Sequence, residues 1–226
     1  MTAFTALVLA GSRPELDLLS AYAGVPHKSL IELNGQSLLS RVVKALALAG
    51  AARISVCTSH PAVIAAVAGI DCAAALDVVP AAGSPSQSVG ESARALGFPL
   101  LVTTADHALL RPEWVTDFLA GVPQQADIAA LLAPEAAVRA AVPDTERTYL
   151  AFRDGRYSGC NLFYLSTARA LQVIELWRQV ESHRKQPWKV AALLGPGMLV
   201  RYALGRLSLD EAARRLGRKA GVEAAI

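Results

Sequence analysis

The sequence predicts an α/β fold in which a mostly parallel sheet is flanked by helices and followed by a helical C-terminal extension. Short apolar runs alternate with stretches of helical spacing through the first 165 residues, and the spacing is helical from Ser166 onward. Apolar residues make up 53% of the 226 and charged residues 18%, which supports a sizeable core and excludes a disordered or fibrous protein. We therefore expect an α/β domain over 1–165 and a basic helical extension over 166–226 packed on it.

Each expected strand is a short apolar run bounded by turn-forming residues. The single strands are expected at 5–10, 53–58, 76–79, 99–104 and 127–132. A further pair, 148–152 and 157–165, is expected to turn at Asp154 and Gly155.

The expected helices show apolar residues at helical spacing and recognisable end signals. Gly50 closes the first helix as a residue able to adopt positive φ, and Pro112 suits the first helical position of another. Ser208 with Glu211 has the spacing of a capping box at the start of the last helix. The helices within the first domain are expected at 37–49, 61–68, 87–96 and 112–120.

Charge is distributed unevenly along the chain. The net charge of +3 is too small to indicate a nucleic-acid partner, yet ten basic residues oppose four acidic ones from Arg178 onward. A solvated helix face explains this imbalance most simply. A patch for an anionic substrate, a protein partner or a lipid surface is the alternative, and the apolar segment 187–207 with its basic rim is where a membrane or lipid-phosphate contact would lie. A homodimer is left open.

Three well-separated cysteines (Cys57, Cys72 and Cys160) lack the spacing of a metal site and indicate reduced thiols. The mean hydropathy of +0.35 is high, but the uncharged run 54–70 is too short and too polar to cross a bilayer. No basic segment precedes the first apolar run, so no signal peptide is expected. These features predict a cytoplasmic protein.

The first expected strand ends in Leu9, Ala10 and Gly11, followed by Ser12 and Arg13. A glycine just past a strand lets backbone N–H groups approach a phosphate or a base edge, and an arginine adds a fixed positive charge. Neither the phosphate-binding loop G-x-x-x-x-G-K-[ST] nor G-x-G-x-x-G is present, which argues against a P-loop kinase and an ordinary dinucleotide dehydrogenase.

Three further elements have side chains suited to a polyphosphate. Lys28 lies between an irregular loop and an apolar run, where its ammonium group can reach phosphate. The loop 82–89 brings Gly83, Ser84 and Ser88 to a helix N-terminus, although capping by Ser86 or Ser88 would also explain it. Asp106 follows a buried strand, where open α/β sheets bind ligands, and is the best candidate for a Mg²⁺ ligand.

Taken in order, these elements resemble the MobA-like NTP transferase superfamily. The matching segments are Ala10-Gly11, His27-Lys28-Ser29-Leu30-Ile31 ahead of Leu33-Asn34-Gly35-Gln36-Ser37, the Gly-Ser loop, and Thr104-Ala105-Asp106-His107. The superfamily includes molybdenum-cofactor guanylyltransferases and cytidylyltransferases. The resemblance implies a Rossmann-like GT-A fold.

The resemblance also implies roles for individual residues. Lys28, Asp106 and Arg13 would be catalytic, with Asp106 binding Mg²⁺, and Asn161 in the run 157–163 is similar to the family's acceptor-facing strand. The residues implied to line the nucleotide are Leu9, Ala10, Gly11, Ser12, Lys28, Gly83, Ser84, Ser88, Thr104 and Asn161.

The implied reaction moves a nucleoside monophosphate from GTP or CTP to a small phosphorylated or hydroxylated acceptor and releases pyrophosphate. Relatives usually add a second metal carboxylate after a C-terminal strand, and 221–226 supplies no such Asp-x-Asp run. A truncated chain, a metal site completed by Asn161, or an impaired activity would each explain this. The alternative functions are a GT-A glycosyltransferase using a nucleotide-sugar and a catalytically weak nucleotide-binding regulatory protein.

Overall fold

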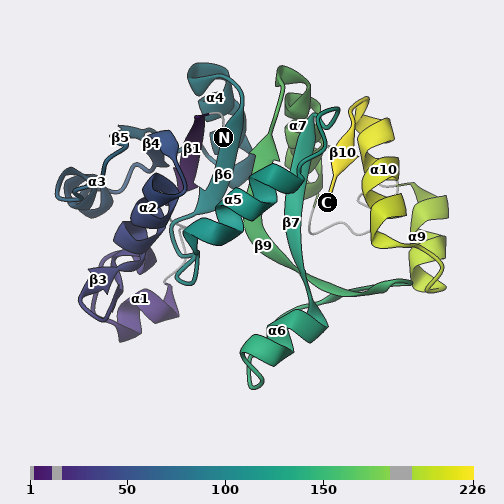
Figure 1. The fold of residues 1–226 in the computed structure, drawn as a ribbon, viewed down its shortest axis with the longest axis horizontal. Helices are drawn as coiled ribbons and strands as arrows, with labels where there is room; N and C mark the ends of the chain where they lie inside the picture. The colour runs from purple at the N-terminus through teal and green to yellow at the C-terminus, as the bar shows by residue number, and fades with distance from the viewer. Residues whose placement is uncertain (1–2, 12–16, 184–194) are drawn as a thin grey trace. The chain divides into compact units, whose positions relative to one another are not determined.

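The computed structural model describes residues 3–11, 17–183 and 195–226, which form two compact units, Met1–Gly121 and Val122–Ile226. Figure 1 shows both units. The sequence predicted a division at residue 165. The units divide earlier because the strand 128–134 pairs with the last strand, and Arg153 and Asp154 hydrogen-bond to Leu207 and Leu209 at the start of the last helix.

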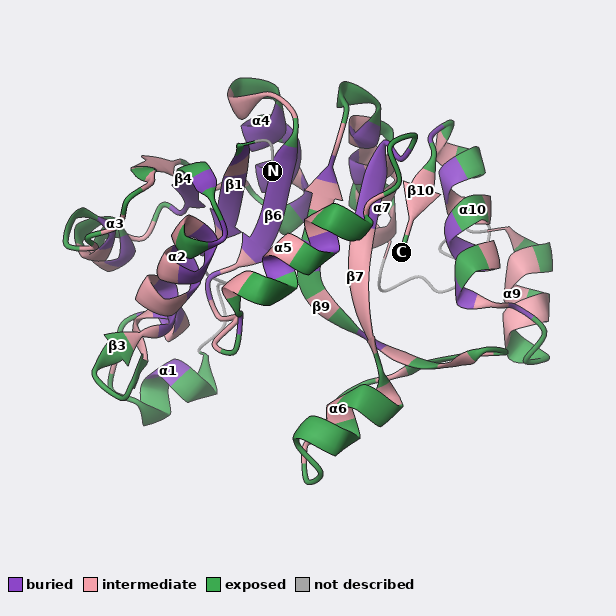
Figure 2. Ribbon diagram, viewed as in Figure 1, coloured by how far each residue is buried: buried purple, intermediate pink, exposed green. Residues whose placement is uncertain are grey.

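The first unit is built on four parallel strands. β1 (Phe4–Leu9) lies between β4 (Ala51–Cys57) and β6 (Leu100–Thr104), and β5 (Ala75–Val79) pairs with β4 on its other edge. Figure 2 shows that β1, β4 and β6 are largely buried, as expected for strands of a parallel sheet, which read as near-continuous apolar runs. The alternation of strands and helices predicted for this region is confirmed.

The helices of the first unit begin and end close to their predicted positions. They are α2 (Leu38–Leu48), α3 (Pro61–Ala68), α4 (Pro85–Leu96) and α5 (Pro112–Gly121). Helix α4 begins two residues earlier than predicted, because Ser84 and not Ser86 or Ser88 caps it: its hydroxyl accepts from the Gln87 amide at 3.3 Å.

The segment before α2 was predicted as an irregular loop up to Lys28 followed by an apolar run, and it contains short regular elements. It contains α1 (Leu18–Tyr22), the 3₁₀ turn η1 (Lys28–Leu30), and the hairpin of β2 (Glu32–Leu33) and β3 (Gln36–Ser37). Asn34 and Gly35 both have positive φ, 51° and 73°, which is the geometry of the two-residue turn that joins twisted antiparallel strands.

The second unit combines a mixed sheet with helices. β9 (Gly155–Leu165) pairs antiparallel with both β7 (Ile128–Pro134) and β8 (Leu150–Phe152). The other elements are α6 (Glu135–Ala141), the 3₁₀ turn η2 (Ala168–Ala170), α7 (Leu171–Ser182), α9 (Pro196–Ala203), α10 (Leu209–Ala220) and β10 (Ala224–Ala225).

The C-terminal extension is therefore not helical throughout, because β10 pairs in parallel with β7. The chain turns back after α10 through Gly221, whose φ of 71° suits a residue without a side chain. Gly217 lets the helix approach the returning chain: a Cβ there would lie 2.7 Å from the Val222 carbonyl oxygen. The sequence predicted the helices of this region but missed the strand.

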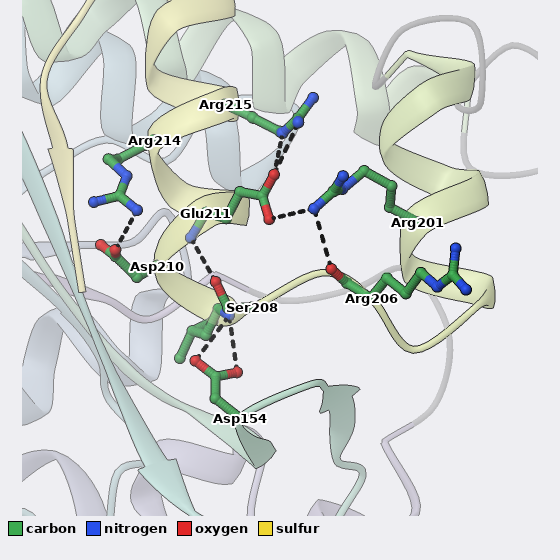
Figure 3. Close-up of polar contacts among 9 residues, drawn as sticks. Asp154, Arg201, Arg206, Ser208, Asp210, Glu211, Arg214 and Arg215 are labelled. Atoms are coloured by element: carbon green, nitrogen blue, oxygen red, sulfur yellow. Dashed lines mark hydrogen bonds and ion pairs between the residues drawn. The ribbon is translucent and has the colours of Figure 1, made fainter.

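The start of α10 is held by a polar network that also joins it to α9 and the β8–β9 turn (Figure 3). Ser208 caps the helix by accepting from the Glu211 amide at 3.2 Å, as predicted. The Glu211 carboxylate does not complete the capping box: it pairs with Arg201 at 3.0 Å and Arg215 at 2.8 Å. Asp154 accepts from the Leu209 amide at 3.0 Å, satisfying a further amide of the first turn.

Asp127 joins β7, β10 and η2 through a buried carboxylate. Its oxygens accept from the Thr167 hydroxyl at 2.7 Å and the Glu223 amide at 3.0 Å, and Arg169 lies 3.3 Å away. The Thr167 hydrogen bond lowers the pKa of Asp127 most strongly; burial raises it, and the Glu223 amide and the Arg169 charge lower it further, so that the pKa lies below the ordinary aspartate value. The carboxylate is only 4% exposed, so its ionised form depends on these partners.

We expect Asp127→Asn to destabilise the protein at pH 7 by about 1–3 kcal/mol, because one buried acceptor becomes a donor facing the Glu223 amide. The folded-state pKa lies below the unfolded value, so the contribution of Asp127 is fully present above the unfolded pKa and is lost as pH falls through the folded pKa. Urea unfolding at pH 7 and pH 3 measures this. The gap between wild type and variant should shrink at pH 3, with the exposed Asp144→Asn as control; a gap that stays constant would contradict the assignment.

Candidate active site

The candidate site of the first unit lies where its parallel strands end. The strand pairing continues one residue past each strand: the Ala10 amide donates to the Cys57 carbonyl at 2.9 Å, Ala105 to Leu9 at 2.9 Å, and Thr58 to Val79 at 3.0 Å. The loops that follow β1, β4, β5 and β6 therefore leave one edge of the sheet from fixed positions. This carboxyl edge is where open α/β sheets bind ligands.

Lys28 and Asp106 form the central contact at this edge. The Lys28 ammonium lies 2.6 Å from Asp106 Oδ2, although the residues are 78 positions apart in the sequence. Lys28 begins the turn η1, and Asp106 follows β6 by two residues. Their side chains are 40% and 32% exposed, so both charged groups remain accessible to a ligand. The structure brings together the two residues that the sequence predicted as separate catalytic groups.

The electrostatic environment keeps Asp106 ionised. Burial raises its pKa most strongly, but the Lys28 hydrogen bond and charge, the nearby Thr104 side chain and its own backbone amide together outweigh burial and leave the pKa below the ordinary aspartate value. Thr104, predicted as a nucleotide-lining residue, lies at the end of β6, and its buried hydroxyl has no hydrogen-bond partner among the described residues. At neutral pH the site holds one anionic and one cationic side chain in contact.

The loop between β5 and α4 is fixed by its own serines. Ser88 accepts from the Ala82 amide at 3.0 Å, and the hydroxyls of Ser84 and Ser86 lie 3.0 Å apart. At Gly83 a Cβ would lie 2.9 Å from Gln87 Oε1, so the missing side chain leaves room for the amide of Gln87. The predicted residues Gly83, Ser84 and Ser88 therefore lie together around the first turn of α4.

The other predicted residues of the first unit lie at the end of β1. Leu9 is half-buried, Ala10 is buried, and Gly11 is exposed with open space where a Cβ would be. The side of Gly11 from which a Cβ would project is therefore open. Ser12 and Arg13 lie outside the residues that the structure describes.

Asn161 lies in the second unit, on β9, at an irregularity of the strand. Opposite β7 the register changes between Ala130 and Leu132, and Asn161 has a positive φ of 50°. Its side chain is exposed. At this irregularity Asn161 departs from the regular alternation of side chains along the strand. Such β-bulges are common near binding sites.

His27 and His60 belong to the same edge and were not assigned a role from the sequence. His27 is 4% exposed, its Nδ1 accepts from the Ser29 amide at 3.1 Å, and its ring centroid lies 5.4 Å from that of His60. A polar residue directly before a short turn is a capping signal, and it could have been read at His27. His107 lies in the loop after β6, and its Nδ1 is 3.4 Å from Thr103 Oγ1.

Within residues 3–11, 17–183 and 195–226, no three His, Cys, Asp or Glu side chains cluster as a metal cage. Asp106 is instead a single accessible carboxylate beside a cation. This donor set fits a Mg²⁺ ion that takes one or two protein carboxylates and several substrate phosphate oxygens. It does not fit a tightly held structural metal.

Several basic residues in the described part of the C-terminal region pair with acids. Arg178 pairs with Glu175. Figure 3 shows Arg214 paired with Asp210, and Arg201 and Arg215 both paired with Glu211. These pairs favour the solvated helix face over an anion-binding patch. Residues 187–194 of the predicted membrane-contacting segment lie outside the described residues, and no helix among those described is long and apolar enough to span a bilayer.

Comparison with solved structures supports the fold. The chain resembles a hypothetical transferase from Thermus thermophilus with 30% identity and a TM-score of 0.83, covering 100% of this chain and 92% of that one. A CMP:2-keto-3-deoxy-manno-octonic acid synthetase complexed with CTP matches with 17% identity and a TM-score of 0.55, covering 84% and 86% of the two chains. A nucleotidyl transferase from Methanothermobacter matches with 23% identity and a TM-score of 0.55, covering 80% and 84%. At these identities the last two show the shared fold alone.

No curated protein sequence matches the chain significantly. The family model described as the MobA-like NTP transferase domain matches residues 6–223, which spans both compact units and extends past the region 5–165 where the sequence motifs lie. Together with a Rossmann-like, mostly parallel α/β sheet flanked by helices, this match shows that the chain belongs to the MobA-like NTP transferase family.

Proposed function

We propose that the protein is a Mg²⁺-dependent nucleotidyltransferase that transfers a nucleoside monophosphate from GTP or CTP to a small phosphorylated or hydroxylated acceptor. The observation that supports this most is the Lys28–Asp106 contact at the carboxyl edge of the parallel strands. It places one accessible cation and one accessible carboxylate where a chain of this family would receive a triphosphate.

In the proposed reaction an acceptor oxygen forms a bond to the α-phosphorus. The bond from that phosphorus to the oxygen bridging to the β-phosphate breaks, and its electron pair leaves with pyrophosphate. A phosphate acceptor enters as an anion, whereas a hydroxyl acceptor releases its proton to solvent. Such a reaction depends on in-line positioning and on neutralising charge, and it needs no covalent intermediate with the protein.

Lys28 and Asp106 divide the electrostatic work. The ammonium group of Lys28 is 40% exposed and would neutralise phosphate oxygens as the leaving group gains charge. Asp106 is ionised at neutral pH and would hold Mg²⁺, with Arg13 proposed as a second cation beyond the described residues. When bound with the nucleotide, Mg²⁺ supplies charge neutralisation and orientation of the phosphate oxygens.

The remaining nucleotide contacts are proposed for the loops beside this pair. The exposed backbone after Leu9 and Ala10 at Gly11 can approach a base or a phosphate, with Ser12 following it. Gly83, Ser84 and Ser88 surround the first turn of the 12-residue helix α4, where a helix N-terminus favours anionic or ribose groups. Thr104 would act through Asp106, and Asn161 is proposed as an acceptor contact.

We expect Asp106→Asn to lower turnover by at least about a hundredfold while the protein stays folded, because the variant retains the shape of the side chain and loses its charge. Pyrophosphate release from GTP or CTP, with acceptors screened in pools, measures turnover, and thermal unfolding measures stability. Asp117→Asn, an exposed carboxyl group on α5 of the same unit, is the matched control and should keep full activity. Turnover retained within about tenfold, a cost near 1.4 kcal/mol, would show that Asp106 is not the metal ligand.

Thermal stability against ATP, GTP, CTP and UTP, each with Mg²⁺ or EDTA, should identify the donor. A ligand at a hundred times its Kd adds about 2.7 kcal/mol, which raises the Tm by several degrees for a chain of this length. We expect a Mg²⁺-dependent shift with GTP or CTP, and its loss in Lys28→Met. Stabilisation by a nucleotide-sugar alone would favour a glycosyltransferase. Triphosphate binding that is never followed by pyrophosphate release would favour a regulatory protein.

A further inference from the structure

We propose that His27 is a positioning residue whose imidazole fixes the turn η1, so that Lys28 is presented to Asp106 and to the phosphates of the nucleotide. This inference rests on the proposed function for its catalytic consequence. The placement of Lys28 by His27 can be tested without any nucleotide. His27 would touch neither the substrate nor the metal ion and would act only through Lys28.

The turn that includes Lys28 is short and depends on His27 for its hydrogen bonds. The side chain of His27 caps the three-residue turn η1. Its Nδ1 accepts from the Ser29 amide at 3.1 Å and lies 2.8 Å from Ser29 Oγ. The His27 carbonyl also accepts from the Leu30 amide at 2.9 Å. Ser29 is fully buried, so the backbone on both sides of Lys28 is fixed while its own side chain stays accessible.

The same imidazole contacts one further segment at the carboxyl edge. The ring of His60 packs against it, with 5.4 Å between the ring centroids. His60 is held in turn, because its amide donates to Thr58 Oγ1 at 3.1 Å just past β4. His27 therefore connects η1 to the loop that follows β4.

This arrangement requires a neutral imidazole. Nδ1 can accept from the Ser29 amide only with its lone pair free, which places the ring proton on Nε2. Burial lowers the pKa of His27 most strongly; the Gly11 carbonyl and Asp17 raise it, whereas His60 and Lys28 lower it further. Protonation would turn the acceptor into a donor and add a charge beside Lys28. The positioning therefore holds at neutral pH and is lost as pH falls through the folded-state pKa.

The first test measures the reactivity of Lys28 in the protein without nucleotide. An ammonium group held in an ion pair acetylates slowly, so peptide-resolved acetylation by an N-hydroxysuccinimide ester reports how often Lys28 leaves Asp106. We expect Lys28 in His27→Ala to react several times faster than in wild type, relative to the exposed Lys219 as internal reference. His27→Asn should keep the slow rate, because asparagine is also a good N-cap acceptor.

Ser37→Ala is the matched control. Ser37 caps α2 in the same unit by accepting from the Ser40 amide at 3.1 Å, so its loss destabilises the unit through a missing cap that does not include Lys28. We expect slow acetylation of Lys28 in this variant. An unchanged Lys28 rate in His27→Ala, or an equal acceleration in Ser37→Ala, would overturn the proposal. If His27→Ala does not fold, a fast Lys28 rate in the folded His27→Gln would support it and a slow rate would overturn it.

The second test measures nucleotide affinity against pH, with the triphosphate that stabilises the wild type in Mg²⁺. His27→Ala should bind about tenfold more weakly at pH 7.5, equal to about 1.4 kcal/mol. Wild-type affinity should fall below pH 6.5 more steeply than that of His27→Asn, in which the cap cannot titrate. If the affinities of wild type and His27→Asn fall in parallel with pH, the proposal that protonation of His27 weakens binding is overturned. If no triphosphate binds the wild type, the proposed function fails, and the acetylation result still decides whether His27 positions Lys28.

Discussion

Parallel pairing of β1 with β4 and β6 is the constraint on which the candidate site depends. Parallel strands all run in the same direction, so the loops that follow them lie at the same edge of the sheet. The backbone hydrogen bonds that continue past the strands at Ala10, Thr58 and Ala105 then fix where each loop starts. Local hydrogen bonds, such as the one that Ser88 accepts from the Ala82 amide, then fix the conformation within each loop.

The candidate site contains few charged side chains, which is consistent with a ligand that is itself charged. A single carboxylate at Asp106 is stabilised in its ionised form by a single ammonium group from Lys28, against the cost of burial. Half-buried ions of opposite sign can each exchange their partner for a ligand group at modest cost, which a fully buried pair cannot do. Buried polar groups elsewhere serve stability, as Asp127 does between β7, β10 and η2.

The sequence predicted the strands and helices of the first unit well because each is a strongly patterned run with clear end signals. The resemblance to the MobA-like superfamily implied that Lys28, Asp106 and the loop with Gly83 and Ser88 form one site, and the structure brings Lys28 and Asp106 into contact. It missed His27 as a turn-fixing residue: its place before the turn η1 is a local capping signal, but the burial of its imidazole depends on contacts distant in the sequence. It also missed β10, whose two residues are too few to carry a pattern and pair only because β7 is available.

The pairing of β10 with β7 affects how the protein folds during synthesis. Asp127 accepts from the Glu223 amide across a separation of 96 residues. A contact of such long range closes late, and on the ribosome it cannot close until residue 223 has left the exit tunnel. Before that, β7 presents an unpaired edge, which is a template for aggregation or for exchange between chains. The four parallel strands of the first unit have no such delay, because all four can pair with one another once Thr104 emerges.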